Sequence, residues 1–256
     1  MTTYDTDAPA ATGTARLTVV QNSPDVTLDA YADQLAADLR VVRAFDGEPV
    51  PGADRLDDLG DGLVVLGGHM SAYDDARAPW LPALRELLLA AATSDVPTLG
   101  ICLGAQLLAV AGGGHVQVSA PPGREAGATR MYWRAEAATD PVLATLVAGD
   151  AVVHHVTSMH GDAIVDLPAG AVWLGSSNMY PYQAFRLGSA LGVQFHPEAS
   201  RAGFARWCEA FDDVDTASAL AGFDEHEAEL LDGGRRLADA FVAEVRAAVG
   251  RRTLPV

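Results

Sequence analysis

The sequence predicts an α/β domain with a mostly parallel central sheet, helices on both of its faces, and a hairpin-rich antiparallel portion in its second half. Three observations support this prediction. As far as Gly112, short apolar runs alternate with longer runs of helical spacing, which is typical of parallel strands joined by helices. After Gly112, short strand-like pieces are separated by Gly, Pro and Asp turns, which indicates hairpins. The 256 residues, 49% of them hydrophobic, are enough for one large core.

The first half of the chain supplies most of the predicted parallel sheet. Apolar runs bounded by turn residues predict strands at 16–21, 41–44, 62–66 and 97–101. Apolar residues spaced three and four apart predict helices at 29–39, 80–93 and 103–111. The strand at 97–101 runs directly into the helix at 103–111, so the chain must turn sharply between them.

The second half is predicted to form shorter strands and then two helices. The strands are expected at 131–134, 151–157, 171–176, 182–186 and 191–195, and the helices at 202–211 and 225–249. We interpret the acidic stretch 212–215 as a solvated linker. The expected organisation is a disordered leader (1–14), a main domain (15–200) and a C-terminal helical extension packed on the same domain (201–256).

Charge and cysteine content exclude several classes of protein. With 17 basic and 34 acidic residues the formal net charge is −17, which repels nucleic acid and anionic membranes. Two cysteines form neither a disulfide framework nor a Cys-rich metal site, and they fit a reducing cytoplasm. The N-terminus lacks the basic and apolar regions of a signal peptide, and the longest apolar stretch, 87–92, is too short to span a bilayer. We therefore expect a cytoplasmic protein without nucleic-acid or membrane partners. The sequence leaves the oligomeric state open, including a homo-oligomer.

The strongest local signal for chemistry is Gly100-Ile101-Cys102-Leu103-Gly104, between a predicted strand and a predicted helix. This G-x-C-x-G pattern is typical of a nucleophile elbow with Cys in place of Ser. The glycines permit close backbone approach, and the helix N-terminus favours the thiolate. The backbone N–H of Leu103 is then placed to stabilise an oxyanion. The alternative is a buried structural cysteine at a tight turn.

The second signal is His196-Pro197-Glu198, directly after the predicted strand 191–195. Side chains two residues apart on an extended chain point the same way, and Pro197 favours an extended His196. Glu198 can then accept a hydrogen bond from one ring nitrogen, which leaves the other to take the thiol proton. The alternative is a histidine at a strand end followed by a surface carboxylate.

The remaining histidines and the second cysteine carry weaker signals. His154 and His155 are neighbours in a predicted strand and must face opposite ways, so structural or surface roles are favoured. His115 and His226 have no supporting sequence context. Cys208 lies on an apolar helical stretch and is expected in the core.

Several segments together resemble class I (triad-type) glutamine amidotransferase domains. GICLGAQLLA (residues 100–109) and GVQFHPE (192–198) resemble the two signatures of that family, and Gly67-Gly68 resembles its glycine loop facing the nucleophile. His160-Gly161-Asp162 is similar to a segment of the branch related to the amidotransferase subunit of GMP synthase. The resemblance covers about residues 62–200 and implies a flavodoxin-like architecture.

The resemblance implies a Cys102, His196 and Glu198 triad that hydrolyses the side-chain amide of glutamine through a γ-glutamyl thioester. Backbone amides near Gly68 and Leu103 would hold the oxyanion. It further implies that Gly67, Gln106 and His160 help to bind the substrate. The alternatives are a polar residue near a helix N-terminus for Gln106 and a turn held by Asp162 for His160. This chemistry requires no metal or organic cofactor.

Two departures from the family pattern affect the substrate pocket. His69, after the glycine pair, is no hallmark of the family and is expected to line the mouth of the site. Met159 stands before His160, where related branches commonly have an aromatic residue.

Three functions remain open from the sequence. No synthetase domain is expected in the chain, so ammonia would pass to a separate ATP-dependent synthetase subunit. Alternatively, a stand-alone γ-glutamyl hydrolase or peptidase would use the same triad on another γ-glutamyl compound. A non-catalytic module is disfavoured, because Cys102, His196 and Glu198 are all present.

Overall fold

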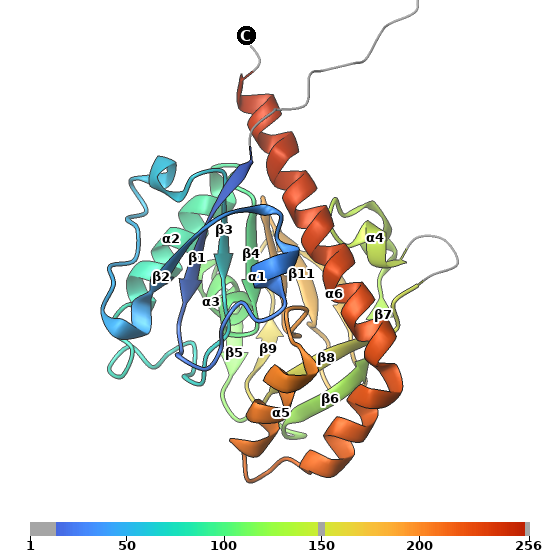
Figure 1. The fold of residues 1–256 in the computed structure, drawn as a ribbon. Coiled ribbons are helices and arrows are strands. Elements are labelled where there is room, and N and C mark those ends of the chain that lie inside the picture. The colour runs from blue at the N-terminus through green and yellow to red at the C-terminus, as the bar shows by residue number, and fades with distance from the viewer. Residues whose placement is uncertain (1–13, 148–151, 254–256) are drawn as a thin grey trace, which may run out of the picture.

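The computed structural model describes residues 14–147 and 152–253, and its centre is an eight-stranded mixed sheet (Figure 1). The strand order is β2 (Ala37–Arg43), β1 (Ala15–Gln21), β3 (Gly62–Val65), β4 (Thr98–Ile101), β12 (Ala190–Val193), β11 (Ala184–Leu187), β10 (Val172–Ser176) and β7 (Tyr132–Trp133). From β2 to β12 neighbouring strands are parallel, and from β12 to β7 they are antiparallel. The predicted division between a parallel first half and a hairpin-rich second half is confirmed.

Helices cover both faces of this sheet, as predicted. On one face, α2 (Leu81–Thr93) and α3 (Leu103–Ala111) bury leucines such as Leu84 and Leu107 against β3 and β4. On the other face, the long helix α6 (Thr216–Thr253) and the short helix α1 (Tyr31–Gln34) cover β1 and its neighbours. Their contact is fixed by Tyr31, whose hydroxyl donates to the Gly234 carbonyl on α6 at 3.2 Å.

Two small sheets and several short helical segments complete the structure. One sheet pairs β5 (His115–Gln117) with β9 (Ala163–Asp166), and the other pairs β6 (Glu125–Arg130) with β8 (His155–His160). The short helical segments are η1 (Ala44–Asp46), η2 (Leu56–Leu59), η3 (Ala135–Thr139) and α4 (Ala144–Val147). The sequence analysis missed β5, β6 and β9. Part of the strand predicted at 151–157 lies outside the described residues, and β8 extends beyond it to His160.

The helix predicted at 29–39 is wrong. Only α1 is helical in this stretch, and Ala37 already belongs to β2, the edge strand that pairs in parallel with β1 from Ala15 to Gln21. The Ala- and Leu-rich composition favours a helix locally, but seven paired residues along β1 override that preference. The strand predicted at 41–44 is therefore the second half of β2.

The C-terminal helices follow the prediction with one change of boundary. The first of them is α5 (Arg201–Glu209), and the acidic stretch 212–215 is the linker to α6. Helix α6 begins at Thr216 rather than 225, because the Asp215 carboxylate accepts the N–H of Ser218 and caps the first turn. No helix within the described ranges is both long and apolar enough to cross a bilayer. The leader expected at 1–14 lies outside the described residues except for Thr14.

The order of strands brings two distant segments together. Strand β12 enters the sheet beside β4, with Val193 paired with Ile101. Because the two strands are parallel, the residues that follow them, Cys102 and Gln194, emerge at the same sheet edge. In open α/β sheets this edge is where ligands bind.

Candidate active site

Cys102 occupies the sharp turn between β4 and α3, as the elbow pattern predicts. Its φ of 50° and ψ of −105° are unusual for a residue other than glycine. The backbone on both sides fixes this turn: the Cys102 N–H donates to Val193 O at 2.8 Å, and the Gln106 N–H donates to Cys102 O at 3.0 Å. A Cβ added to Gly104 would lie 2.2 Å from Val65 O, so the elbow requires glycine there.

His196 and Glu198 form a buried pair at the end of β12. The His196 N–H donates to the Thr157 carbonyl of β8 at 2.7 Å, which fixes the backbone that carries the ring. On the ring, Nδ1 lies 2.7 Å from Glu198 Oε1, and both residues are buried. The geometry expected for residues two apart on an extended chain is therefore present.

The imidazole and the thiol meet beside the glycine loop that follows β3. An ideal Cβ built on Gly67 would lie 3.0 Å from His196 Cε1 and 3.5 Å from Cys102 Cβ, so a side chain at this position would press on the histidine ring. Burial by itself lowers the pKa of His196. The charges of Glu198 and Cys102, and hydrogen bonds with both, outweigh burial and raise this pKa from 6.5 to about 10. These interactions favour the protonated imidazolium form of His196. The structure thus brings the three residues predicted as a triad into one cluster.

The glycine loop and the elbow helix face each other across the cluster. A Cβ on Gly68 would lie 2.9 Å from Leu103 Cδ2 and 2.7 Å from Met70 Sδ. Asn22 supports the loop by donating from its side-chain amide to Leu66 O at 2.8 Å. Gly68 and Leu103, the residues predicted to supply the oxyanion hole, are therefore neighbours beside the nucleophile.

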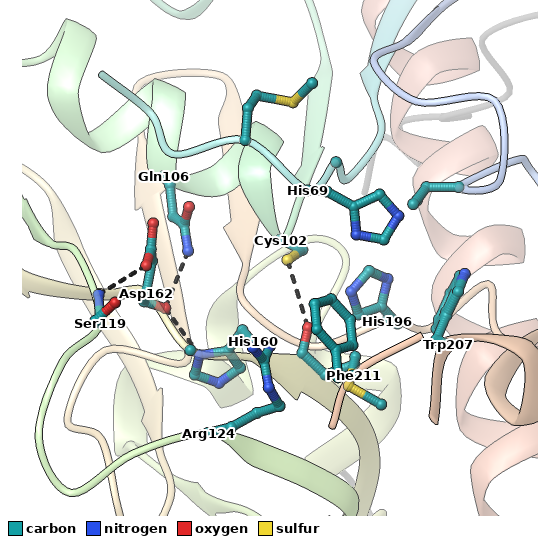
Figure 2. Close-up of a pocket in the computed structure, with 15 residues that line it drawn as sticks. His69, Cys102, Gln106, Ser119, Arg124, His160, Asp162, His196, Trp207 and Phe211 are labelled. Atoms are coloured by element: carbon teal, nitrogen blue, oxygen red, sulfur yellow. Dashed lines mark hydrogen bonds between the residues drawn. The ribbon is translucent and has the colours of Figure 1, made fainter. Parts of the chain in front are cut away.

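Cys102 lies on the wall of a cavity of about 140 Å³, shown in Figure 2. The size suits a small metabolite rather than a larger, drug-sized ligand. Other residues that line the cavity include His69, Met70, Gln106, Arg124, Met159, His160, Asp162, His196, Trp207 and Phe211. His69 therefore lines the site, as expected, and its Nε2 lies 2.5 Å from Asp25 Oδ2.

Gln106 and His160 both line the cavity, but protein groups already engage their polar atoms. Gln106 Nε2 donates to Asp162 O at 3.1 Å and to Gln194 Oε1 at 3.2 Å. The His160 ring lies 2.9 Å from Asp162 O through Nδ1 and 3.1 Å from the buried Glu125 carboxylate through Nε2. These bonds fix the cavity wall on which both side chains lie.

The sequence analysis missed five residues that line the cavity: Val26, Ser119, Arg124, Trp207 and Phe211. Trp207 of α5 packs its ring 4.6 Å from the His196 ring, and its indole N–H donates to Asp25 O at 3.2 Å. Phe211, after α5, lies between His69, with ring centroids 5.6 Å apart, and the Arg124 guanidinium, 3.9 Å from the Phe211 centroid. No sequence signal marked these residues, because they lie outside the short motifs that carry the resemblance, at 67–68, 100–109, 160–162 and 192–198.

Arg124 is the one Lys or Arg side chain that lines the cavity among the described residues. Its guanidinium packs on Phe211 and lies about 3.6 Å from the Cβ position of Gly161. Arg124 Nε also donates to the carboxylate of Asp213, at 2.9 and 3.1 Å. The Asp213 side chain is 59% exposed, so this partner is held mainly by Arg124 and faces solvent.

Comparison with known proteins agrees with this geometry. The family model "Glutamine amidotransferase class-I" matches residues 27–206. The glutamine-hydrolysing GMP synthase of Streptomyces coelicolor is 32% identical over 173 residues, which are 66% of this chain and 30% of that protein. The enzyme of the same name from Streptococcus equi subsp. zooepidemicus is 35% identical over 54% of this chain and 24% of its own length. The chain thus spans less than a third of these curated relatives.

Solved structures match over nearly the whole chain. A glutamine amidotransferase from Thermotoga maritima has a TM-score of 0.76 at 26% identity, covering 90% of this chain and 99% of its own. A glutamine amidotransferase from Methylobacillus flagellatus has the same TM-score at 27% identity, covering 91% and 96%. The match to the family model spans well over half of the residues, and the chain therefore belongs to the class I glutamine amidotransferase family.

Proposed function

We propose that the chain hydrolyses the side-chain amide of glutamine to glutamate and ammonia, with Cys102 as nucleophile, His196 as acid and base, and Glu198 as the group that orients His196. One observation carries this proposal: a thiol, an imidazole and a buried carboxylate form a single cluster that opens into a small cavity. The stand-alone γ-glutamyl hydrolase is not favoured, because the relatives described above are amidotransferases or glutamine-hydrolysing enzymes.

In the first half of the reaction, the Cys102 thiolate forms a bond to the amide carbon of glutamine. The carbonyl oxygen becomes an oxyanion, which the backbone N–H groups of Gly68 and Leu103 are placed to stabilise. The C–N bond then breaks, and the proton on His196 goes to the leaving nitrogen, which departs as ammonia. A γ-glutamyl thioester remains on Cys102.

In the second half, water replaces ammonia on the same face of the thioester. His196 takes a proton from the water as its oxygen bonds to the thioester carbon. The C–S bond breaks, glutamate leaves, and the thiolate and imidazolium are restored. Because the Glu198 carboxylate accepts from Nδ1 at 2.7 Å, the same ring nitrogen serves both halves of the reaction.

For substrate binding we assign the α-carboxylate of glutamine to Arg124. A protein with a net charge of −17 repels an anionic group unless a local cation compensates. The cavity histidines already have partners: Asp25 for His69, Glu125 for His160, and Glu198 for His196. A substrate carboxylate can replace the exposed Asp213 on Arg124. Gly67, Gln106 and His160 would complete the pocket wall.

The released ammonia is proposed to pass to a separate ATP-dependent synthetase subunit. The relatives named GMP synthase are much longer than the region that matches this chain, and their name couples glutamine hydrolysis to synthesis of GMP.

The experiment that tests the proposal follows ammonia and the thioester together. Wild-type protein should release ammonia from glutamine and, with hydroxylamine present, form γ-glutamyl hydroxamate. Cys102→Ala should do neither while keeping its fold by circular dichroism. Equal ammonia release by the wild type and Cys102→Ala would show that this cysteine is not the nucleophile.

A further inference from the structure

A second cluster of titratable side chains joins α6 to β8, outside the lining of the catalytic cavity. It consists of His155 on β8 and of His226 and Glu229 on α6. His155 Nδ1 lies 2.9 Å from Glu229 Oε2, and His226 Nδ1 lies 3.8 Å from the same oxygen. The two imidazole rings are stacked, with centroids 3.7 Å apart and planes at 20°.

The donor atoms of this cluster lie close enough together to share one metal ion once the stacked rings turn. One ligand atom from each residue lies within 4.8 Å of the other two. Four ligands in tetrahedral geometry, with bonds of about 2.0–2.1 Å, are about 3.4 Å apart. The Nδ1 to Oε2 distances of 2.9 and 3.8 Å bracket this value. Two imidazoles with one carboxylate suit zinc and its first-row neighbours, whereas calcium and magnesium prefer oxygen ligands alone.

The surroundings of Glu229 hold its carboxylate toward the rings. Its Oε1 accepts the backbone N–H groups of His154 and His155, at 2.5 and 3.3 Å, at the start of β8. The outer oxygen, Oε2, is thereby directed at both imidazoles. Such support of a ligand by a backbone donor is typical of metal sites, where it fixes the orientation of the ligand.

We propose that His155, His226 and Glu229 bind a divalent first-row transition-metal ion of the zinc class, which links α6 to β8. Nδ1 of His155 and Nδ1 of His226 can face the same ion only if the two imidazole rings turn out of their stacked arrangement. The His226 side chain is 29% exposed, and this solvent-facing ring is the one with room to turn. Water completes the coordination on the exposed side. The site takes no part in the proposed hydrolysis.

The link has a structural consequence for the strand behind the catalytic histidine. Two residues beyond His155, the Thr157 carbonyl accepts the His196 N–H at 2.7 Å. A bound ion would tie this strand to the long helix and so stabilise the folded protein by mass action. We expect the unfolding temperature to rise on the order of 5 °C when the ion is at one hundred times its dissociation constant.

The test uses Cys102→Ser protein, because a reactive thiol would itself bind zinc. Equilibrium dialysis against Zn²⁺, and titration with Co²⁺ followed by visible absorption, measure stoichiometry and ligand type. The key comparison adds His226→Ala in one sample and His115→Ala in another. His115 is a matched control, since its ring contacts Tyr73 and lies outside the cluster. Thermal unfolding with and without Zn²⁺ gives an independent readout.

One equivalent of Zn²⁺ should bind to Cys102→Ser and to the His115→Ala control, and binding should weaken at least about tenfold with His226→Ala. The Co²⁺ complex should lack the charge-transfer band of a thiolate ligand. His155→Ala should reproduce the loss, and Mg²⁺ should not compete. The inference is overturned if binding is absent, if it survives in His226→Ala, or if it requires Cys102. A thermal shift of equal size in His226→Ala and His115→Ala would also overturn it.

Discussion

Glu198 Oε1 lies 2.7 Å from His196 Nδ1, and both side chains are buried. The two residues are separated only by Pro197, so the extended chain presents both on the same side. The carboxylate holds the ring through Nδ1, and in the proposed mechanism the other ring nitrogen serves Cys102. Two predictions depend on this pair.

Glu198→Gln should lower kcat by about 10²–10⁴-fold, because the amide no longer fixes the ring in its productive tautomer or stabilises the imidazolium. Glutamine KM should change much less, since Glu198 lies behind His196 rather than among the cavity-lining residues. Steady-state ammonia release measures both values. Glu209→Gln, which changes an exposed carboxylate at the end of α5, is the control and should retain wild-type kinetics. A Glu198→Gln enzyme with wild-type kcat would remove Glu198 from the mechanism.

The same pair makes the free energy of unfolding depend on pH in the alkaline range. The pKa of His196 rises from 6.5 to about 10 on folding, so the folded protein binds this proton more tightly than the unfolded chain. The stabilisation is therefore complete below about pH 6.5 and is lost as the pH rises through about 10. Chemical denaturation between these pH values should show a falling free energy of unfolding for the wild type. His196→Gln should show a smaller fall, and identical pH profiles for the two proteins would contradict the assignment.

The elbow glycines give a prediction about packing. In Gly104→Ala the new Cβ would lie 2.2 Å from Val65 O, so strand β3 or helix α3 must shift. We expect a loss of about 1–3 kcal/mol in the free energy of unfolding and a displaced Cys102 with strongly reduced activity. Gly222→Ala in α6 is the control. A Cβ there meets nothing within 4 Å, and the substitution should stabilise the protein by about 0.4–1 kcal/mol. Equal changes in the free energy of unfolding for the two substitutions would show that the close contact with Val65 O does not destabilise Gly104→Ala.

Local sequence rules worked where one short segment determines the geometry. The elbow at Cys102 and the bounds of α3 follow from Gly100, Gly104 and the apolar strand before them, all adjacent in sequence. The same local rules failed for β2, where pairing with β1 overrides a helix-favouring composition.

Sites assembled from distant segments could not be predicted in the same way. Phe211 reaches the cavity because the chain after α5 passes over Arg124, and His226 meets His155 because α6 crosses β8. Neither residue has a sequence neighbour that indicates a role. Triad logic suggested from the sequence that His196 serves Cys102, and the family resemblance supplied the spatial relation between their two segments.

Arg124 gives the sharpest prediction about substrate recognition. If its guanidinium binds the α-carboxylate of glutamine, Arg124→Gln should raise KM about 10- to 100-fold, because a hydrogen-bonded charge pair contributes about that much to binding. The value of kcat should stay within about threefold of wild type. Arg124→Lys should recover part of the loss, because it keeps the charge but not the paired N–H donors. Arg130→Gln, at the exposed far end of β6, the strand that begins directly after Arg124, is the matched control.

Substrate analogues separate carboxylate binding from a purely structural role of Arg124. Glutamine α-amide has no α-carboxylate, so the wild type should hydrolyse it with a KM about 10- to 100-fold above that for glutamine. Arg124→Gln should lose this preference and process both compounds with similar KM, since the charge pair is then absent in either case. Asp213→Asn should lower KM for glutamine, because it removes the carboxylate that competes for the guanidinium. An Arg124→Gln enzyme that still prefers glutamine to its α-amide by the wild-type factor would show that Arg124 only holds Phe211 and Asp213 in place.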